Sequence, residues 1–351
     1  LLDLDANNQS NGSVTSTISG TGFLTPVAID AANSLIVKNW SVSGLDLVLA
    51  NGTTYNVADF PKIWIDNTLY NTYTGDTFVS DSAYAMTGQV AYDTVTDIDL
   101  SSKSLTTNIT NEFLSKFSNL LILKLQSNLV SNINLYNNTK LTRVELWSNN
   151  FTSIDITNNV NLTIFFCQLN SLTSLNVINN ILLELFYCYE NSLTSLDVTN
   201  NVNLKDLRVY RNSLTSLNLT NNVLLEILIY FDNVVGNIDL SNNISLKNVQ
   251  LYRTGTTILN VTNNISLERV VCFSNSITSL DFSNNVLLNY VDCRSNLLNN
   301  VANSQILIDL DGNGLSNGYI TSTISGGGTL TTAGLAAKAA LLLKGWTIVG
   351  L

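Results

Sequence analysis

Apolar and polar positions recur along this chain with a constant period, in which the same pattern returns at every twenty-first position. A leucine marks each repeat, and we call these residues the anchors: Leu120, Leu141, Leu162, Leu183, Leu204, Leu225, Leu246, Leu267 and Leu288. Apolar residues follow three and five positions after each anchor. Asparagine follows eight positions after every anchor except Leu246, where the residue is Thr254. An unbroken period of this kind predicts a solenoid, in which each repeat is one coil stacked on the preceding coil.

The pattern L-x-x-L-x-L/C-x-x-N resembles the consensus strand of a leucine-rich repeat, and the resemblance covers about residues 96 to 313. Each coil closes on a double asparagine, as at Asn200–Asn201 and Asn221–Asn222. We expect the asparagine side chains to bond backbone groups where the coil turns, because a tight coil buries amides and carbonyls that need partners. A coil this short has no room for a full outer helix. A second short strand or extended segment is expected there, giving a weakly curved rod.

The two ends of the chain are similar to each other in sequence. Residues 2–45 align with 308–351 at a constant offset of 306 without a gap. In the C-terminal copy, the stretch Ile308–Asn313 fits one more repeat strand. A Gly-rich stretch follows, then a predicted helix around Ala333–Leu343 that Gly345 would stop, and a final strand at Trp346–Val349. Such a unit suits the cap that covers the open end of a solenoid.

These patterns predict a mainly β solenoid: an array of parallel strands in 21-residue coils, flanked by two homologous α+β capping units. The expected domains are a cap unit at 1–45, a β-rich spacer at 46–95, the repeat array at 96–304 and a C-terminal cap unit at 305–351. The first cap is interpreted as the end of a preceding module. The alternative is a duplicated cap that works as a free-standing domain.

The strand face is the candidate binding surface, because the positions four and six after each anchor should point outward. The candidate binding residues are the aromatic side chains at those positions: Trp147, Phe166, Tyr187, Tyr189, Tyr210, Phe231, Tyr252 and Phe273. Exposed aromatic residues at this density are typical of a recognition surface, and flat rings with polar flanks suit sugar faces or a partner protein. The structural alternative stays open, because aromatic residues favour strands and stack on their neighbours one coil away.

Charge and composition argue against several classes of function. Columns such as Glu184, Lys205 and Glu226 alternate in sign from coil to coil, which avoids repulsion between stacked charges. The net charge of −10 argues against a nucleic-acid partner, and the absence of an 18-residue apolar run argues against membrane insertion. The sequence has no histidine, and it shows neither a nucleophile elbow nor a phosphate-binding loop. We therefore expect no enzyme activity and no cofactor.

Two further motifs have structural interpretations. Cys167, Cys188, Cys272 and Cys293 share the inward fifth position after the anchor, which predicts buried free thiols rather than disulfides or a metal site. The stretch Asp309–Gly314 looks like a calcium loop. Its position in the repeat makes it a repeat strand and turn instead, so no metal site is predicted.

The short Asn-rich coils and the helix-then-Gly-Trp cap resemble internalin-like bacterial surface proteins, and they are also similar to surface and tail-fibre proteins of phages. This resemblance implies a non-enzymatic recognition or adhesion protein outside the cytoplasm, on a bacterial cell surface or a phage virion. It implies a surface glycan or protein receptor as partner, with neighbouring copies or further modules of the same chain as additional partners. The alternative is a structural bead of a fibre, sheath or virion decoration with no separate ligand.

Overall fold

A computed structural model describes the repeat array and the C-terminal region. The described residues are four short strands between Ser13 and Asn56, residues 96–105, 114–115 and 117–234, and residues 236–351. The chain forms two compact units. Unit 1 comprises 1–96 and 107–119, and unit 2 comprises 97–106 and 120–351.

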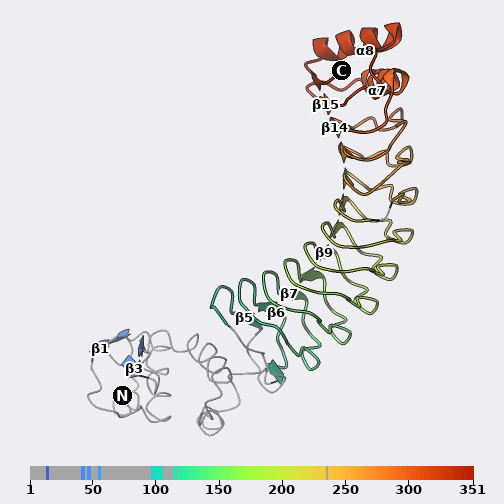
Figure 1. Ribbon diagram of the computed structural model, residues 1–351. Coiled ribbons are helices and arrows are strands. Elements are labelled where there is room, and N and C mark those ends of the chain that lie inside the picture. Colours follow the sequence, from blue (N-terminus) through green and yellow to red (C-terminus); the bar gives the residue numbers. More distant parts are fainter. Residues whose placement is uncertain are drawn as a thin grey trace. The chain divides into compact units, whose positions relative to one another are not determined.

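Among the described residues of unit 2, strands of three residues each form a parallel sheet in strict sequence order, from β5 to β16 (Figure 1). The strands are β5 (Asp97–Asp99), β6 (Ile122–Lys124), β7 (Arg143–Glu145), β8 (Ile164–Phe166), β9 (Leu185–Tyr187), β10 (Asp206–Arg208), β11 (Ile227–Ile229), β12 (Asn248–Gln250), β13 (Arg269–Val271), β14 (Tyr290–Asp292), β15 (Tyr319–Thr321) and β16 (Thr347–Val349). In the array, equivalent residues of successive coils are direct partners, as for Leu207 and Leu228. The predicted β solenoid of leucine-rich repeats is confirmed.

The interior of the array is built from the predicted apolar columns. Every anchor from Leu120 to Leu288 has 0% exposure, and so do all four cysteines. The cysteines are free and buried, as expected. Burial raises the pKa of the Cys167 and Cys272 thiols well above the usual range, so these thiols act as small apolar side chains.

The asparagine eight positions after the anchor bonds one coil to the coil before it. Asn149 donates from Nδ2 to the carbonyl of Leu125 in the preceding coil (2.9 Å) and accepts at Oδ1 from the backbone N–H of Val130 (3.0 Å). Where the column has Thr254, its hydroxyl donates to the Leu251 carbonyl at 2.9 Å. The predicted role of these side chains at the turn is confirmed.

The second asparagine of each pair forms another buried column. Asn201 has 0% exposure, and its Nδ2 donates to the carbonyls of Val177 (2.9 Å) and Asn180 (2.8 Å) in the preceding coil. The same two bonds recur in the coils on either side, for example from Asn222 to Val198 and Asn201. These side chains complete the backbone hydrogen bonding of the coil before them.

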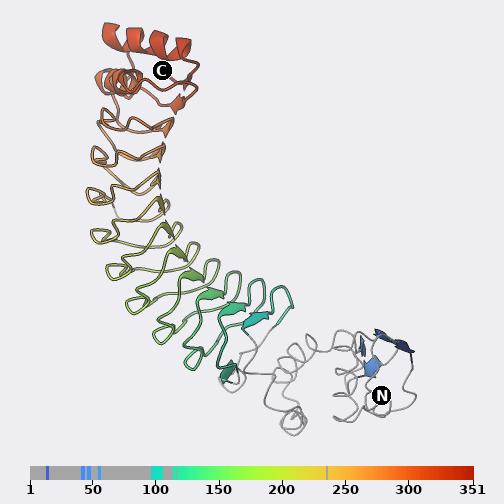
Figure 2. The same ribbon diagram turned by 180° about the vertical axis from the view of Figure 1, so that it is seen from behind.

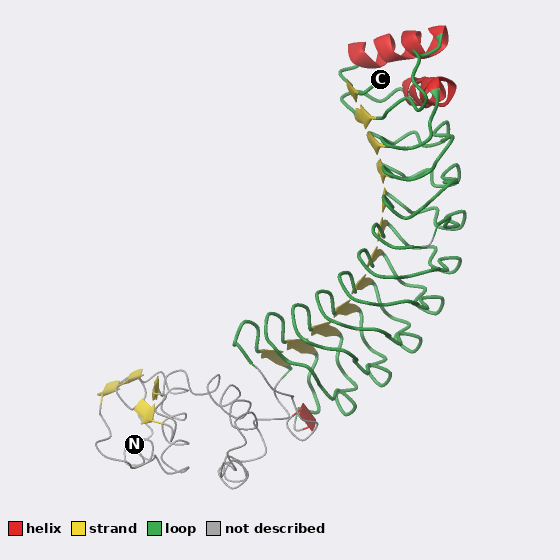
Figure 3. Ribbon diagram, in the orientation of Figure 1, coloured by secondary structure: helices red, strands yellow, loops and turns green. Residues whose placement is uncertain are grey.

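The outer side of the described coils carries turns and segments without regular secondary structure, with one bridge residue at Ile133 (Figure 3). Of the two expected forms, the full second strand is therefore absent there. The array of unit 2 is also more curved than a weakly bent rod, and its strands follow the concave side (Figures 1 and 2). Strand pairing holds the backbones about 4.8 Å apart on the inner side. The unpaired outer turns have no such constraint, so the coils can spread there.

One residue in each coil has a left-handed backbone, although none of these residues is glycine. The position seven after the anchor has φ between 52° and 58° in every coil from Ser127 to Ser295. Leu169 and Arg211 occupy this position despite the strain that side chains meet there. The bend directs the chain away from the strand and into the turn that the buried asparagine holds.

Residues 305–351, the expected C-terminal cap, differ from the prediction in their first element. Helix α7 spans Asn300–Gly312, so the expected repeat strand at Ile308–Asn313 is wrong. In the calcium-loop-like stretch only the expected turn is present, at Asn313 and Gly314. The buried residues Asn303, Ile306, Leu307 and Leu310 follow helical spacing, and Asn299 caps the helix by accepting from the Ala302 N–H. This helical spacing outweighs the strand-like spacing of Ile308 and Leu310.

The rest of the C-terminal cap follows the prediction. Helix α8 (Thr332–Leu343) ends before Gly345, whose φ is +80°, and β16 follows it. The Nδ2 of Asn313, just after α7, donates to the carbonyls of Phe282 (2.9 Å) and Asn285 (3.2 Å). Asn313 therefore takes the place that the next buried asparagine would have had in another coil.

The described strands of unit 1 include a pair that matches the end of the C-terminal cap. Strands β1 (Ser13–Thr15) and β2 (Ser41–Ser43) pair in parallel with Val14 opposite Val42. An offset of 306 carries this pair onto β15 and β16, where Ile320 lies opposite Ile348. The assignment of 1–45 as a cap unit remains a prediction. Strands β3 (Asp46–Val48) and β4 (Thr54–Asn56) form an antiparallel pair, and the rest of the expected spacer lies outside the described residues.

The outer turns alternate between aspartate and asparagine, which leads to a prediction about acid stability. Asp197 accepts from the backbone N–H and the hydroxyl of Thr199 (2.9 and 2.6 Å), and Asn218 makes the same two bonds with Thr220 (3.1 and 2.7 Å). These bonds lower the pKa of Asp197. The pKa values of the equivalent side chains Asp155, Asp239 and Asp281 are also lowered by such bonds.

A folded-state pKa below the unfolded value means that the stabilisation is complete above the unfolded pKa and is lost as the pH falls through the folded pKa. Replacing the four aspartates with asparagine should therefore make the melting temperature depend less on pH below about pH 4. Melting curves at several pH values, followed by circular dichroism, test this expectation. An unchanged acid-induced drop in the variant would assign acid unfolding to other carboxylates.

Candidate functional site

The strand face carries all the candidate binding residues. The outward positions are two, four and six after each anchor, and the strands that carry them follow the concave side of the array (Figure 1). The candidates are half-buried, except Phe231, which is only 9% exposed. The structure therefore places them on one face but packs them closely against one another.

Five of the eight candidates form one stacked ladder, which we call the ring ladder: Tyr189, Tyr210, Phe231, Tyr252 and Phe273. Successive ring centroids are 4.2–4.3 Å apart, and the ring planes differ by 10–16°. At this spacing each inner ring has both faces covered by its neighbours. The solvent-facing parts of the ladder are therefore ring edges and tyrosine hydroxyl groups.

A guanidinium group covers the C-terminal end of the ring ladder. The Arg294 side chain lies over the Phe273 ring, 5.0 Å from its centroid. At the other end, Gln168 occupies the position before Tyr189 and separates the ladder from Trp147. The indole Nε1 of Trp147 contacts Glu145 Oε2 at 3.4 Å. Trp147 thus lies on the same face but outside the ladder.

The remaining two candidates, Phe166 and Tyr187, form a second stack with ring centroids 4.4 Å apart. The Arg208 guanidinium lies 4.5 Å from the Tyr187 centroid, and it also forms two hydrogen bonds with Asp206 (3.0 and 2.9 Å). The Tyr187 hydroxyl donates to Asp206 Oδ2 at 2.8 Å. Burial, followed by this bond to Asp206, raises the pKa of Tyr187 to about 12. The phenol therefore stays neutral at physiological pH.

The sequence interpretation missed a third column, at the position two after the anchor. There the Arg269 guanidinium lies 3.6 Å from the Tyr290 centroid, and Tyr290 stacks on Tyr319 at 5.1 Å. Asp206 and Arg143 belong to the same column. The repeat period could have revealed them, because a strand that points inward at the third position points outward at both the second and the fourth.

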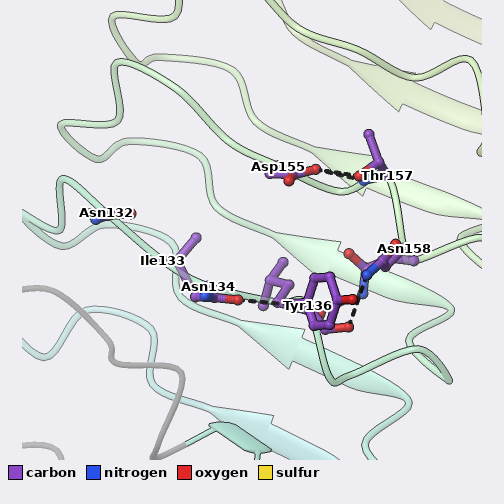
Figure 4. Close-up of a pocket in the computed structure, with 9 residues that line it drawn as sticks. Asn132, Ile133, Asn134, Tyr136, Asp155, Thr157 and Asn158 are labelled. Carbon is purple, nitrogen blue, oxygen red and sulfur yellow. Dashed lines mark hydrogen bonds between the residues drawn. The ribbon is translucent and has the colours of Figure 1, made fainter.

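Two hollows lie on the outer side of the described coils. One of about 210 Å³ lies beside Asn134, Tyr136, Asp155 and Thr157 (Figure 4). Its polar side chains already bond within the turns: Asn134 accepts from the Tyr136 N–H, and Asp155 accepts from Thr157. A larger hollow of about 570 Å³ borders Asp281 and α7. Neither brings together the acid, base and nucleophile that a catalytic site needs.

The described residues contain no group of three or more His, Cys, Asp or Glu side chains that could hold a metal ion. In the calcium-loop-like stretch, Asp309 is bonded to Gln305 (2.8 Å) and to the Phe282 N–H (3.0 Å), while Asp311 pairs with Lys344 at 2.6 Å. Within the same described part of the chain, no helix is both long and apolar enough to cross a membrane.

No protein-family model and no curated protein matches the chain. Solved structures do match. The functional domain of InlJ from Listeria monocytogenes, which includes a cysteine ladder, is 29% identical over 67% of this chain and 51% of its own, with a TM-score of 0.61. The Leptospira interrogans leucine-rich repeat protein LIC12759 is 18% identical over 75% of this chain and 73% of its own (TM-score 0.58).

The plant peptide hormone receptor RGFR1, solved in complex with RGF2, is 20% identical over 66% of this chain and 41% of its own, with a TM-score of 0.56. This chain spans about half of the InlJ chain that it matches. The constant coil, the parallel sheet and the asparagine columns agree with these likenesses. The chain has the fold of a leucine-rich repeat protein.

Proposed function

We propose that this chain is a non-enzymatic recognition module that binds a protein receptor through its strand face, on the outside of a bacterial cell or a phage particle. The observation that carries the proposal is the ring ladder. Its spacing of 4.2–4.3 Å covers the ring faces, on which a sugar would stack, and leaves the ring edges exposed. Aromatic edges are electropositive, so they suit carbonyl oxygens, carboxylates and the faces of other rings, which a protein surface supplies.

The groups around the ring ladder support a protein partner as well. Arg208 and Asp206 form a half-buried ion pair beside Tyr187, and Arg294 stands at the ladder's end. Aromatic residues next to arginine are the residue types that dominate the energy of protein interfaces. The repeat fold is also that of RGFR1, which was solved with the peptide hormone RGF2. Together these features favour protein recognition over a surface glycan.

Double replacement of Tyr210 and Tyr252 by serine tests the proposal. Both rings are inner members of the ladder, so their loss should break its continuous edge and weaken binding at least tenfold, about 1.4 kcal/mol. The measurement is binding of the fluorescently labelled full chain to intact bacterial and epithelial cells. Protease treatment of the cells should abolish binding, whereas periodate oxidation of their glycans should not.

Two controls separate ring chemistry from general damage. Replacing both tyrosines with phenylalanine keeps the stack and removes only the hydroxyl groups, so binding should fall less than threefold. Tyr136→Ser changes an exposed ring away from the strand face and should leave binding unchanged. Full binding by the double serine variant would favour the structural alternative, a bead of a fibre, sheath or virion surface. Loss of binding after periodate alone would identify a glycan receptor instead.

A further inference from the structure

An exposed aliphatic column runs along one flank of the array, away from the ring ladder. Its members stand two positions before successive anchors, and all are β-branched. We call this column the flank ridge: Val160 (44% exposed), Ile181 (51%), Val202 (44%), Val223 (45%), Ile244 (56%), Ile265 (58%) and Val286 (50%). It is unbroken over seven consecutive coils. At about 4.8 Å per coil the ridge is roughly 30 Å long.

Folding does not require this column to be apolar. The anchor two positions later is fully buried and supplies the interior contact, as Leu225 does after Val223. The first coil has Thr139 at the ridge position, which shows that the coil accepts a polar side chain there. The adjacent column, one position before each anchor, contains both apolar and polar residues, such as Leu224 and Asn203. A continuous exposed apolar strip of this length marks an interaction surface.

A column of alternating charge runs beside the flank ridge, three residues further along each coil: Glu184, Lys205, Glu226, Lys247 and Glu268. Its side chains are 42–48% exposed where they pair within the chain, at 2.7 Å for Lys205 with Glu184 and 2.6 Å for Lys247 with Glu226. The surface therefore joins an apolar strip to a charged strip whose sign changes at every coil.

We propose that the flank ridge binds the flank ridge of a second copy of this chain, with the two arrays antiparallel. Both copies have identical ridges, so their side chains are spaced at the same period. Each aliphatic side chain can therefore contact one of the second copy along the whole ridge. A two-fold axis produces this arrangement, because one surface serves both partners. The axis lies along the radius of the curved array, so both concave strand faces stay open on the same side.

The charged column selects one alignment of the two copies. When the axis passes between the coils of Glu226 and Lys247, Glu226 faces Lys247 of the second copy, and Lys205 faces Glu268 of the second copy. In the same alignment Val223 faces Ile244 of the second copy. A shift of the axis onto Glu226 itself would bring like charges together along the whole column. Complementary charge therefore favours the first alignment.

The available area agrees with a stable pair. The exposed surface of the seven ridge side chains is on the order of 500 Å² per copy, so the two copies bury about 1,000 Å² together, the lower bound for a specific interface. Leu182, Leu224 and Leu287 in the adjoining column, 40–47% exposed, add to this area. We expect a reversible dimer with a dissociation constant in the micromolar range.

Sedimentation of the full chain between about 1 and 100 µM tests the proposal. The wild type should pass from monomer to dimer. The triple variant Val202→Lys, Val223→Lys, Ile244→Lys should stay monomeric, with at least a tenfold higher dissociation constant. The matched control Leu129→Lys, Ile258→Lys, Leu297→Lys changes three side chains off the ridge that are 52–67% exposed, and it should dimerise as the wild type does.

Charge reversal tests the alignment and needs no change to the ridge. One variant makes the column all lysine (Glu184→Lys, Glu226→Lys, Glu268→Lys), and another makes it all glutamate (Lys205→Glu, Lys247→Glu). Each variant alone should be monomeric, and an equal mixture should form the dimer. A monomeric wild type over the whole range, or a ridge variant that dimerises normally, overturns the proposal. The Tyr210→Ser, Tyr252→Ser variant should still dimerise, so failure here and failure of receptor binding are distinguishable.

Discussion

Replacing Leu225 with aspartate is expected to unfold the middle of the array. Leu225 is fully buried in the anchor column, so the change removes about 2 kcal/mol of apolar burial and places an unpaired carboxylate in the interior. Together these effects should cost more than about 4 kcal/mol. Each coil contacts only its neighbours, so the damage should be centred on the coils between β10 and β12.

Leu224→Asp is the matched control, because Leu224 precedes the anchor directly and is 44% exposed. Its cost should stay below about 1 kcal/mol. Chemical denaturation measures both free energies, and hydrogen exchange locates the affected coils. Equal costs for the two variants would mean that the interior and exterior positions of the repeat have been assigned wrongly.

Replacing Asn201 with leucine should produce the second-largest loss of stability. The leucine side chain has the same number and branching of heavy atoms, but it cannot donate to the buried carbonyls of Val177 and Asn180. Each carbonyl keeps one backbone donor, the Asn180 N–H for Val177 (3.0 Å) and the Leu183 N–H for Asn180 (3.1 Å). The variant therefore loses two buried hydrogen bonds of about 0.5–1.5 kcal/mol each, an expected total of about 1–3 kcal/mol. The Oδ1 atom of Asn201 accepts no hydrogen bond from any described residue, so the loss comes from the donor side of the amide.

The neighbouring Asn200 provides the comparison. Its Nδ2 also donates to the preceding coil, to Ile178 at 3.3 Å, but this contact is exposed to water. Asn200→Leu should therefore cost less than about 1 kcal/mol. Thermal and urea unfolding of both variants decides the matter. Similar losses would show that the double asparagine acts through turn conformation rather than through buried hydrogen bonds.

The sequence was sufficient to predict the inside and outside of most of the array. A constant period without insertions assigns each position to one column, so the burial of Leu204, Cys188 and Asn149 followed from one repeat read correctly. The bonding role of the asparagines followed from a general requirement, that buried backbone groups find partners. These features depend on whether a side chain points into or out of the solenoid, and the repeat period determines that direction.

Other features depend on more than direction. The period places Tyr210 and Phe231 on the strand face, but the covering of their faces depends on ring angles that only packing decides. Helix α7 was missed because Leu310 and Asn313 fit the spacing of a strand, while the helical pattern of Asn303 and Ile306 begins before the aligned segment. The flank ridge was visible in the sequence, but its exposure became clear only with the course of the outer turns.

The asparagine columns determine the order in which the hydrogen bonds of the coils are completed during synthesis. Asn149 completes the backbone of the coil that contains Leu125, and Asn201 completes the coil that contains Val177, so every coil depends on residues that come later in the chain. A ribosome synthesises the chain from the N-terminus. Each coil therefore leaves it with carbonyls that have one donor from their own coil and gain the second only when the following coil emerges. Asn313 ends this sequence, so the last coil of the growing array is completed only when the cap has been made.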